Sequence, residues 1–370
     1  MIFMLGTLLI LGLAPTRPAG PLEAGIMSKR LYPLLGVVLI GGTASLITMN
    51  AQFKRDPSPN FNENFHKSLP GDYSPAEVSY LLGNGKVGAD ALMATIVDLV
   101  RKKRLEIVPA QVYERGTIIF GGKTEEKYRL MLREGTHDTE LNRHEEFLIK
   151  WFLEDLTGSE GLILDDLKGM VKHRYDASKF RENLGAFTVM VGNLISRRNF
   201  FTFADLSRFH IYWLTAAGLL FTGCLAIAIF KAWVFGVSAI FLGLLHPVYL
   251  LAFRKKLRFT KEGIDQVAKW KAFRRFLLHI SDLNSPDIPS IVTVEHYLVY
   301  AISLGVAKEL LEELSQIFRE GELKDPSLSY LGKDDAFKTF EHIADMLNST
   351  LTALHCAVQT SAAGVSKLPV

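Results

Sequence analysis

Cysteine is almost absent from the sequence, which holds two among 370 residues. Cys224 lies in a long apolar run and Cys356 lies near the C-terminus, and neither belongs to a CxxC pair. Structural zinc sites and disulfide frameworks both require paired or closely spaced cysteines. We therefore expect neither kind of site, and we expect no metal or other cofactor.

The motifs of common enzyme classes are also missing. His144-Glu145-Glu146 begins like the zinc-protease motif HExxH, but position 148 is leucine. Gly83-Asn84-Gly85-Lys86 and Gly121-Gly122-Lys123-Thr124 lack the GxxxxGK[ST] frame of a phosphate-binding loop and are typical of turns. We therefore expect that the protein is not an enzyme. We interpret residues 144–146 as the start of a surface helix, with acids in its first turn.

An excess of charge of one sign is missing too, because 42 Lys and Arg face 39 Asp and Glu. Apolar residues make up 48% of the sequence, and the mean hydropathy is +0.17. These values are high for a soluble protein and indicate membrane segments. The clearest segment, Ile211 to Phe253, is long enough for two helices of about 20 residues each. We predict a transmembrane hairpin with helices at 211–230 and 233–253 and a turn at Lys231-Ala232.

Positive charges flank this hairpin on both sides. They are Arg197, Arg198 and Arg208 before it, and Arg254, Lys255, Lys256, Arg258 and Lys261 after it. The positive-inside rule then places both ends of the hairpin in the cytoplasm. A third apolar stretch at about 31–49 predicts an N-terminal anchor, whereas Met1 to Ala14 is too short to span a membrane comfortably.

The region between anchor and hairpin predicts folded modules. Arg55 to Gly71 is rich in Pro, Asn and Ser and is typical of a linker. Ser74-Pro75-Ala76-Glu77 combines a capping box with proline at the first helical position, which predicts a helix start. A second helix is expected over 89–103, followed by two strands near 105–108 and 128–132. Helices followed by a β-hairpin are the plan of a winged helix.

A short internal similarity suggests that this plan is repeated. VDLVRKKRLEI (97–107) aligns with GNLISRRNFFT (192–202) at a shift of 95 positions, although so short a match can arise by chance. The four cations Arg101, Lys102, Lys103 and Arg104 are a candidate face for a protein partner or nucleic acid. However, residues 55–208 hold 22 Lys and Arg against 23 Asp and Glu, which does not favour nucleic-acid binding. Cations at a helix end are also favoured by the helix dipole.

Two further polar features belong to the membrane region. Residues 254–275 carry nine Lys and Arg against two acids, with aromatic residues between them, so we predict lipid-headgroup contact by Lys255, Lys256 and Arg258. These charges could equally serve only to set the topology. His246 lies inside an apolar span and is a candidate intramembrane polar site, or else forms an interhelical hydrogen bond. Farther along, the pattern over 294–318 predicts an amphipathic helix or helix pair, broken near Gly305.

Two stretches resemble a known family. PAEVSYLLGNGKVGADALMATIVDLVRKKRLEI (75–107) and VEHYLVYAISLGVAKELLEEL (294–314) resemble the cytoplasmic half of the YciQ-like predicted membrane proteins, a bacterial family built on a domain of unknown function. The resemblance covers about residues 31–320 and lacks the large N-terminal extracytoplasmic domain of that family. It implies a membrane segment, a winged-helix-like cytoplasmic region, a membrane hairpin and a C-terminal cytoplasmic segment. It implies no catalytic residues.

We predict a mainly α membrane protein of the bacterial inner membrane, multi-pass, with residues 55–208 and 254–370 in the cytoplasm. Its expected parts are an apolar segment with anchor (1–54), a linker (55–71), a winged-helix-like module (72–140), a second helical and winged-helix-like module (141–208), a transmembrane hairpin (209–253), a basic helix with a C-terminal helical region (254–358) and a flexible tail (359–370).

The expected function is that of a non-enzymatic, membrane-tethered scaffold or regulator that contacts lipid and binds a protein partner. One alternative is a membrane-anchored nucleic-acid regulator, which would require the four cations to cluster with Lys86 or Lys123 on an exposed face. A second alternative is a membrane enzyme or transport subunit that uses His246.

Overall fold

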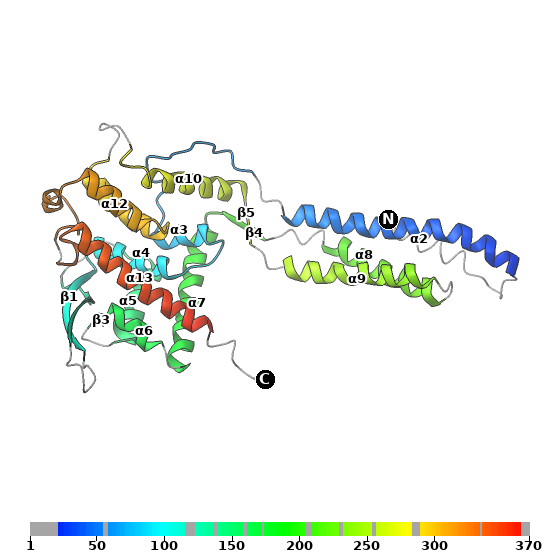
Figure 1. Cartoon of the computed structure of the whole chain (residues 1–370), viewed down its shortest axis with the longest axis horizontal. Helices are drawn as coiled ribbons and strands as arrows, with labels where there is room; N and C mark the ends of the chain where they lie inside the picture. Colours follow the sequence, from blue (N-terminus) through cyan, green and yellow to red (C-terminus); the bar gives the residue numbers. More distant parts are fainter. Residues whose placement is uncertain are drawn as a thin grey trace. The chain divides into compact units, whose positions relative to one another are not determined.

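The computed structural model describes most of the chain, namely residues 21–54, 58–114, 123–135, 140–157, 161–171, 174–203, 209–228, 232–253, 257–282, 289–333 and 335–363. The chain divides into two compact units. Residues 1–57 and 201–260 form the first, which we call the hairpin unit. Residues 58–200 and 261–370 form the second, which we call the core unit. Figure 1 labels the helices and strands of both units.

The hairpin unit contains the two most apolar helices described, α8 (Phe209–Ala228) and α9 (Trp233–Phe253). Both are long and apolar enough to cross a membrane, over His210–Ala228 and Trp233–Leu251. Many of their large apolar side chains are exposed, among them Trp213, Leu214, Phe221, Val234 and Phe241. Exposed apolar side chains along both helices suit contact with lipid chains.

Small residues bring α8 and α9 close together. A Cβ atom added at Gly223 would lie 2.8 Å from the carbonyl oxygen of Gly236, and one at Gly236 would lie 2.8 Å from that of Gly223. Glycine at interhelical contacts lets the backbones of membrane helices approach closely. The described residues of the hairpin predicted over 211–230 and 233–253 thus pack through small and apolar side chains, and none of them forms an ion pair.

A third helix, α2 (Pro21–Lys54), packs against α8 and α9 in the same unit (Figure 1). It contains the stretch predicted as an anchor, and its apolar part, Leu35–Ala51, is shorter than the two candidate spans. Leu35 and Val38 join Leu219 in one apolar cluster. Two short strands, β4 (Phe201–Phe203) and β5 (Leu257–Phe259), pair antiparallel in this unit.

The first half of the core unit follows the predicted order of two helices and a β-hairpin. Helix α3 (Pro75–Leu82) begins with the predicted capping box, in which Ser74 and Glu77 bond each other's backbone N–H. Helix α4 (Ala89–Arg101) is buried along nearly its whole length. It ends because Lys102 leaves the helix and Lys103 adopts a left-handed backbone conformation with φ of 58°. Strands β1 (Leu105–Glu114) and β2 (Lys123–Leu132) follow, paired antiparallel.

The second half of the core unit wraps helices around α4. Strand β3 (Leu162–Ile163) pairs with β2, so the two modules predicted from the sequence share one sheet. The remaining helices are α5 (Arg143–Ile149) with its π-helical continuation Lys150–Asp155, α6 (Leu167–Met170), α7 (Arg174–Ser196), α10 (Lys261–Leu277), α11 (Ile291–Ser303), α12 (Ala307–Ile317) and α13 (Phe340–Ala363). Short 3₁₀ turns lie at Leu164–Asp166, Glu320–Lys324 and Asp335–Phe337.

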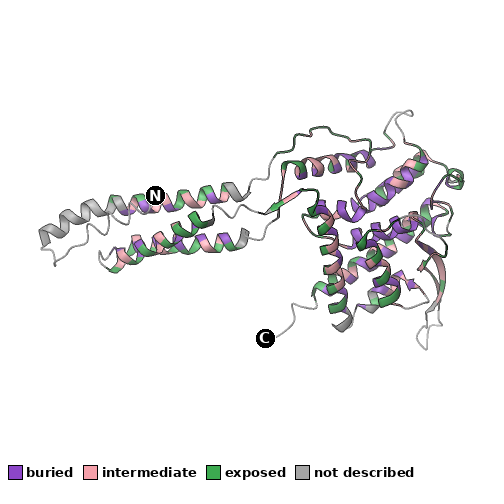
Figure 2. Ribbon diagram, turned by 180° about the vertical axis from the view of Figure 1, so that it is seen from behind, coloured by how far each residue is buried: buried purple, intermediate pink, exposed green. Residues whose placement is uncertain are grey.

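Buried positions gather in these helices, as Figure 2 shows by their purple colour. Helix α11 packs on α3 and α4, and α13 packs on α4 and α7. The predicted break near Gly305 is confirmed, because α11 ends at Ser303 and Gly305 has a φ of 65°. Each of these helices therefore buries one face against α4 or its neighbours.

Helix α10 contributes aromatic residues to the interior of the core unit. Trp270, Phe273 and Phe276 are at most 1% exposed. The Trp270 and Tyr300 rings stack at 5.4 Å between centroids, and Phe273 meets Tyr297 edge to face at 5.0 Å. The aromatic residues between the cations of 254–275 therefore serve protein packing in the core unit, since these rings are enclosed by protein.

The part of the predicted linker that the structure describes, 58–71, has no helix or strand but is tied to the core unit. The Asn60 N–H donates to Asp265 Oδ1 at 2.5 Å, and Arg275 Nε donates to the Asn64 carbonyl at 2.8 Å. The Tyr297 hydroxyl donates to the Lys67 carbonyl at 3.1 Å. This segment thus runs as an extended strap along α10 and α11.

The prediction of a surface helix start at residues 144–146 was wrong for its first two residues. His144 and Glu145 have no exposed surface, although Asn142 and Glu145 do form a capping box at the start of α5. Glu145 is enclosed because it pairs with Lys102 from α4, and His144 packs edge to face on Phe187 of α7. Acids in a first helical turn are typical of surfaces, but here a cation from another helix compensates the buried charge.

Candidate functional site

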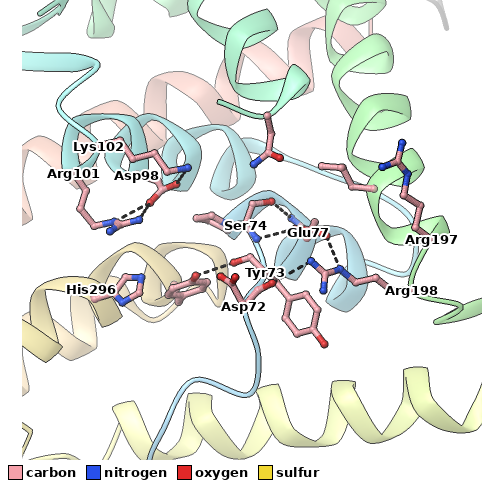
Figure 3. Close-up of a pocket in the computed structure, with 14 residues that line it drawn as sticks. Asp72, Tyr73, Ser74, Glu77, Asp98, Arg101, Lys102, Arg197, Arg198 and His296 are labelled. Atoms are coloured by element: carbon pink, nitrogen blue, oxygen red, sulfur yellow. Dashed lines mark hydrogen bonds and ion pairs between the residues drawn. The ribbon is translucent and has the colours of Figure 1, made fainter. Parts of the chain in front are cut away.

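The main polar site of the core unit is a cavity of about 480 Å³. It lies where the N-terminus of α3 meets the C-terminal ends of α4 and α7, with α11 on a further side (Figure 3). Four cations line it, Arg101 and Lys102 from the end of α4 and Arg197 and Arg198 from the end of α7. We call this the charged cavity.

Asp98 fixes the two cations from α4. Its carboxylate is buried and accepts from Arg101 Nε at 2.9 Å, while its second oxygen lies 2.9 Å from Lys102 Nζ. The spacing of three and four residues places all three side chains on one face of the helix. Lys102 Nζ also donates to Glu145 Oε1 at 2.8 Å. Burial lowers the pKa of Lys102, but Asp98 and Glu145 outweigh it, so the pKa lies above its usual value and the amine stays charged.

Glu77 fixes Arg198 in a similar way. The carboxylate is buried, closes the capping box with the Ser74 N–H at 2.8 Å and accepts from Arg198 Nε at 3.1 Å. Arg198 Nη2 donates to the Asp72 carbonyl at 3.1 Å, and its guanidinium lies 4.4 Å from the centre of the Tyr73 ring. Ion pair, hydrogen bond and cation–π contact together hold this guanidinium at the cavity.

Arg197 differs from the other three cations. It is exposed and makes no ion pair with any residue that the structure describes.

Opposite the end of α7, His296 and Tyr300 line the cavity from α11, and their rings meet edge to face at 5.4 Å. Burial lowers the pKa of His296, and Arg101 lowers it further, so the imidazole is neutral at pH 7. Burial also raises the pKa of Tyr300, whose hydroxyl donates to the Tyr73 carbonyl at 2.8 Å.

The four cations predicted as one face lie in different settings. Arg101 and Lys102 line the charged cavity and pair with acids, whereas Lys103 is exposed and Arg104 is partly buried. Arg197 and Arg198, which align with Lys102 and Lys103, line the same cavity. The two similar stretches therefore end helices that border one cavity. Sequence analysis did not identify Asp98 and Glu77 as partners, although Asp98 stands at helical spacing from both cations.

A second feature of the core unit is an apolar groove of about 560 Å³ beside the end of β2. It is lined by Met131 and Leu132 from β2, by Ile149 and Leu153, and by the exposed acids Glu134 and Glu154. Leu132 is 59% exposed. The groove opens where β3 stops, because β3 pairs only with Arg129 and Leu130 of β2. We call this the β2 groove.

In the hairpin unit, His246 of α9 is buried and bonds across helices. One ring nitrogen lies 2.8 Å from the Leu242 carbonyl and the other lies 3.1 Å from Ser45 Oγ of α2. Tyr249 donates its hydroxyl hydrogen to Asn50 of α2. Of the predicted headgroup contacts, Lys255 and Lys256 lie outside the described residues, and Arg258 stands opposite Thr202 in the β4–β5 pair.

Among the residues that the structure describes, no three His, Cys, Asp or Glu side chains are grouped so as to hold a metal ion. His144 also lacks a hydrogen-bond partner among the described residues. Burial lowers the pKa of His144, so it packs as a neutral ring.

Two helices long and apolar enough to cross a membrane, in a chain with a second and larger helical unit, fit the class of helical membrane proteins. Residues 62–314 match the family described as predicted membrane protein (DUF2207), C-terminal domain, and the chain belongs to this family. The match confirms the family resemblance noted in the sequence. It covers the charged cavity, the β2 groove and the hairpin of α8 and α9. No curated protein and no solved structure matches the chain.

Proposed function

We propose that the protein is a non-enzymatic, membrane-tethered regulator whose core unit binds a protein partner. In this proposal the hairpin unit spans the bacterial inner membrane, with α2 as an additional anchor, and the core unit lies in the cytoplasm. The cations on both sides of the hairpin support this topology. Helices α3 and α4 with the β1–β2 hairpin then act as a winged-helix-like module, a fold that serves more than one kind of binding.

The β2 groove is the observation that carries the proposal. It exposes apolar side chains, chiefly Leu132, together with the exposed acids Glu134 and Glu154. Exposed apolar surface with polar residues around it marks interaction sites. The two acids favour a partner with complementary charge. The partner is therefore a basic amphipathic segment whose apolar face enters the groove.

The charge arrangement supports this function over nucleic-acid binding. Arg101 and Lys102 pair with Asp98, and Lys102 also pairs with Glu145, so these two cations line a cavity and do not form a row on an exposed face. Affinity for nucleic acid comes mainly from cations that are free to contact phosphates along one face.

Photo-crosslinking in native membranes tests the proposal. A photo-reactive amino acid is placed at position 132 in the groove and, as the matched control, at position 189 on α7, where Val189 is 62% exposed. We expect position 132 to crosslink to a basic amphipathic segment of another protein, and position 189 not to do so. Crosslinks to an acidic segment, or equal crosslinks from both positions, would contradict the proposal.

A matched pair of substitutions tests whether the groove itself binds that segment. Leu132→Asp places a charge in the groove and Val189→Asp places the same charge at a similarly exposed position outside it. We expect Leu132→Asp to weaken binding of the identified segment about tenfold or more and Val189→Asp to leave it unchanged.

The topology is tested by a fluorescent protein fused at the C-terminus, which fluoresces only if that end lies in the cytoplasm.

A further inference from the structure

The charged cavity lies outside the β2 groove and has its own chemistry. We infer that it binds a small molecule that carries phosphate, through Arg197, Arg198 and Arg101. The proposal concerns a ligand of the core unit and does not depend on the protein partner proposed above.

The cavity has more donors than its acids can use. Arg198 directs Nε to Glu77 and Nη2 to a carbonyl, which leaves Nη1 with no partner among the described atoms. Arg101 directs Nε and Nη2 to Asp98, and its Nη1 likewise has no partner among the described atoms. Guanidinium groups only donate, so a ligand that fills this space must be rich in acceptors.

Buried acids hold these donors in place. Asp98 and Glu77 are 3% and 5% exposed, and each orients a cation that faces the cavity. Guanidinium groups held in this way match phosphate oxygens in pairs, and less side-chain entropy is lost when they bind. The geometry therefore favours phosphate over an ammonium or neutral ligand.

Arg197 supplies a charge that no acid of the described chain neutralises. It stands next to Arg198 at the end of α7, on the side of the cavity opposite Arg101 (Figure 3). The N-terminus of α3, an eight-residue helix, also faces the cavity at Ser74 and Pro75 and adds partial positive charge. The lining acids are Asp98 and Glu77, which hold Arg101 and Arg198, and the exposed Asp72, so the four lining cations exceed the three acids by one and the cavity stays positive.

The volume and the walls indicate that the ligand is larger than a phosphate ion. Ligand sites typically have volumes of about 300–1,000 Å³, and the cavity has about 480 Å³. The half-buried, neutral His296 gives the cavity an aromatic side that can contact a ring or sugar, whereas Tyr300 already stacks on Trp270 and Tyr73 already contacts Arg198. The ligand class is therefore a phosphorylated small molecule, either a soluble ester or a lipid headgroup that bears phosphate.

Binding is measured on the full-length protein in phosphatidylcholine nanodiscs, with Mg²⁺-free ATP as the soluble probe and adenosine as the probe without phosphate. Arg197→Gln removes the unpaired cation without breaking an ion pair described here, and Lys103→Gln is the matched control. Lys103 is an exposed cation on the same unit that does not line the cavity. Hydrogen exchange of peptides 72–77 and 194–198 reports occupancy of the cavity.

We expect ATP to protect both peptides, adenosine to protect neither, and Arg197→Gln to weaken ATP binding about tenfold while Lys103→Gln has no effect. If ATP protects neither peptide, the same peptides are measured in nanodiscs that contain phosphatidic acid. Protection there that Arg197→Gln removes and Lys103→Gln retains assigns the phosphate to a lipid headgroup. Protection in neither case, protection by adenosine, or equal losses in both variants would overturn the inference.

Discussion

Two regions of the core unit bury carboxylates and use them differently. Glu295 of α11 is 2% exposed and accepts from the backbone N–H groups of Ser329, Tyr330 and Leu331 at 2.7–2.9 Å, while its own carbonyl accepts from the Tyr330 hydroxyl. Asp98 and Glu77 are equally buried, but they hold cations that face the charged cavity. Burial of a charge therefore does not mark a functional site.

The largest expected effect is the loss of the Glu295 contacts. Glu295→Ala removes the acceptor of three backbone N–H groups, those of Tyr330 and Leu331 in buried bonds and that of Ser329 in a partly buried one, so we expect the free energy of unfolding of the core unit to fall by about 3–5 kcal/mol. Hydrogen exchange of the full-length protein in nanodiscs measures the change, most directly at peptide 328–331. Glu309→Ala, at an exposed position of α12, should stay within about 0.5 kcal/mol of wild type.

A smaller loss is expected at the charged cavity. Asp98→Asn keeps the shape of the side chain but removes the charge that pairs with Arg101 and Lys102, so we expect a loss of about 2–3 kcal/mol. Lys102 keeps Glu145 as a partner, which limits the effect. The same exchange measurement, read over α4, gives the result. An effect as large as that of Glu295→Ala would contradict the difference expected between the charged cavity and the Glu295 site.

The dependence of stability on pH gives a third test. Burial lowers the pKa values of His144 and His296 below the usual value of about 6.5, so the unfolded chain binds protons more readily than the folded one. The free energy of unfolding is therefore highest above about pH 6.5. Below that pH it falls by at most about 1.4 kcal/mol per pH unit for each histidine ring. His144→Phe should flatten this slope while preserving packing on Phe187. An unchanged slope would show that His144 does not contribute.

The smallest effect is expected in the hairpin unit, which joins its helices with neutral hydrogen bonds. Ser45→Ala removes the partner of His246, and we expect a loss of about 0.6 kcal/mol, the usual size of such bonds between membrane helices. Ser238→Ala is the control, because Ser238 bonds only within its own helix. The free energy of unfolding in mild detergent distinguishes the two. A loss of several kcal/mol at Ser45 would indicate a larger role for His246.

Features encoded by neighbouring residues were predictable from the sequence. The capping box at Ser74 and Glu77, the apolar hairpin and the break near Gly305 all follow from local patterns. The presence of Arg101 and Arg197 in one cavity was not predictable, because it depends on how α4 and α7 each pack on α3. Burial of Glu145 was missed for the same reason, since its partner Lys102 lies 43 residues away.

The central claim is that the charged cavity is an open site for phosphate and that the Glu295 site is a closed structural one. Hydrogen exchange of the full-length protein in phosphatidylcholine nanodiscs, with and without Mg²⁺-free ATP, compares the two directly. We predict that ATP slows exchange in peptide 72–77 and leaves peptide 328–331 unchanged. Equal slowing in both peptides, or slowing only in peptide 328–331, would contradict the claim.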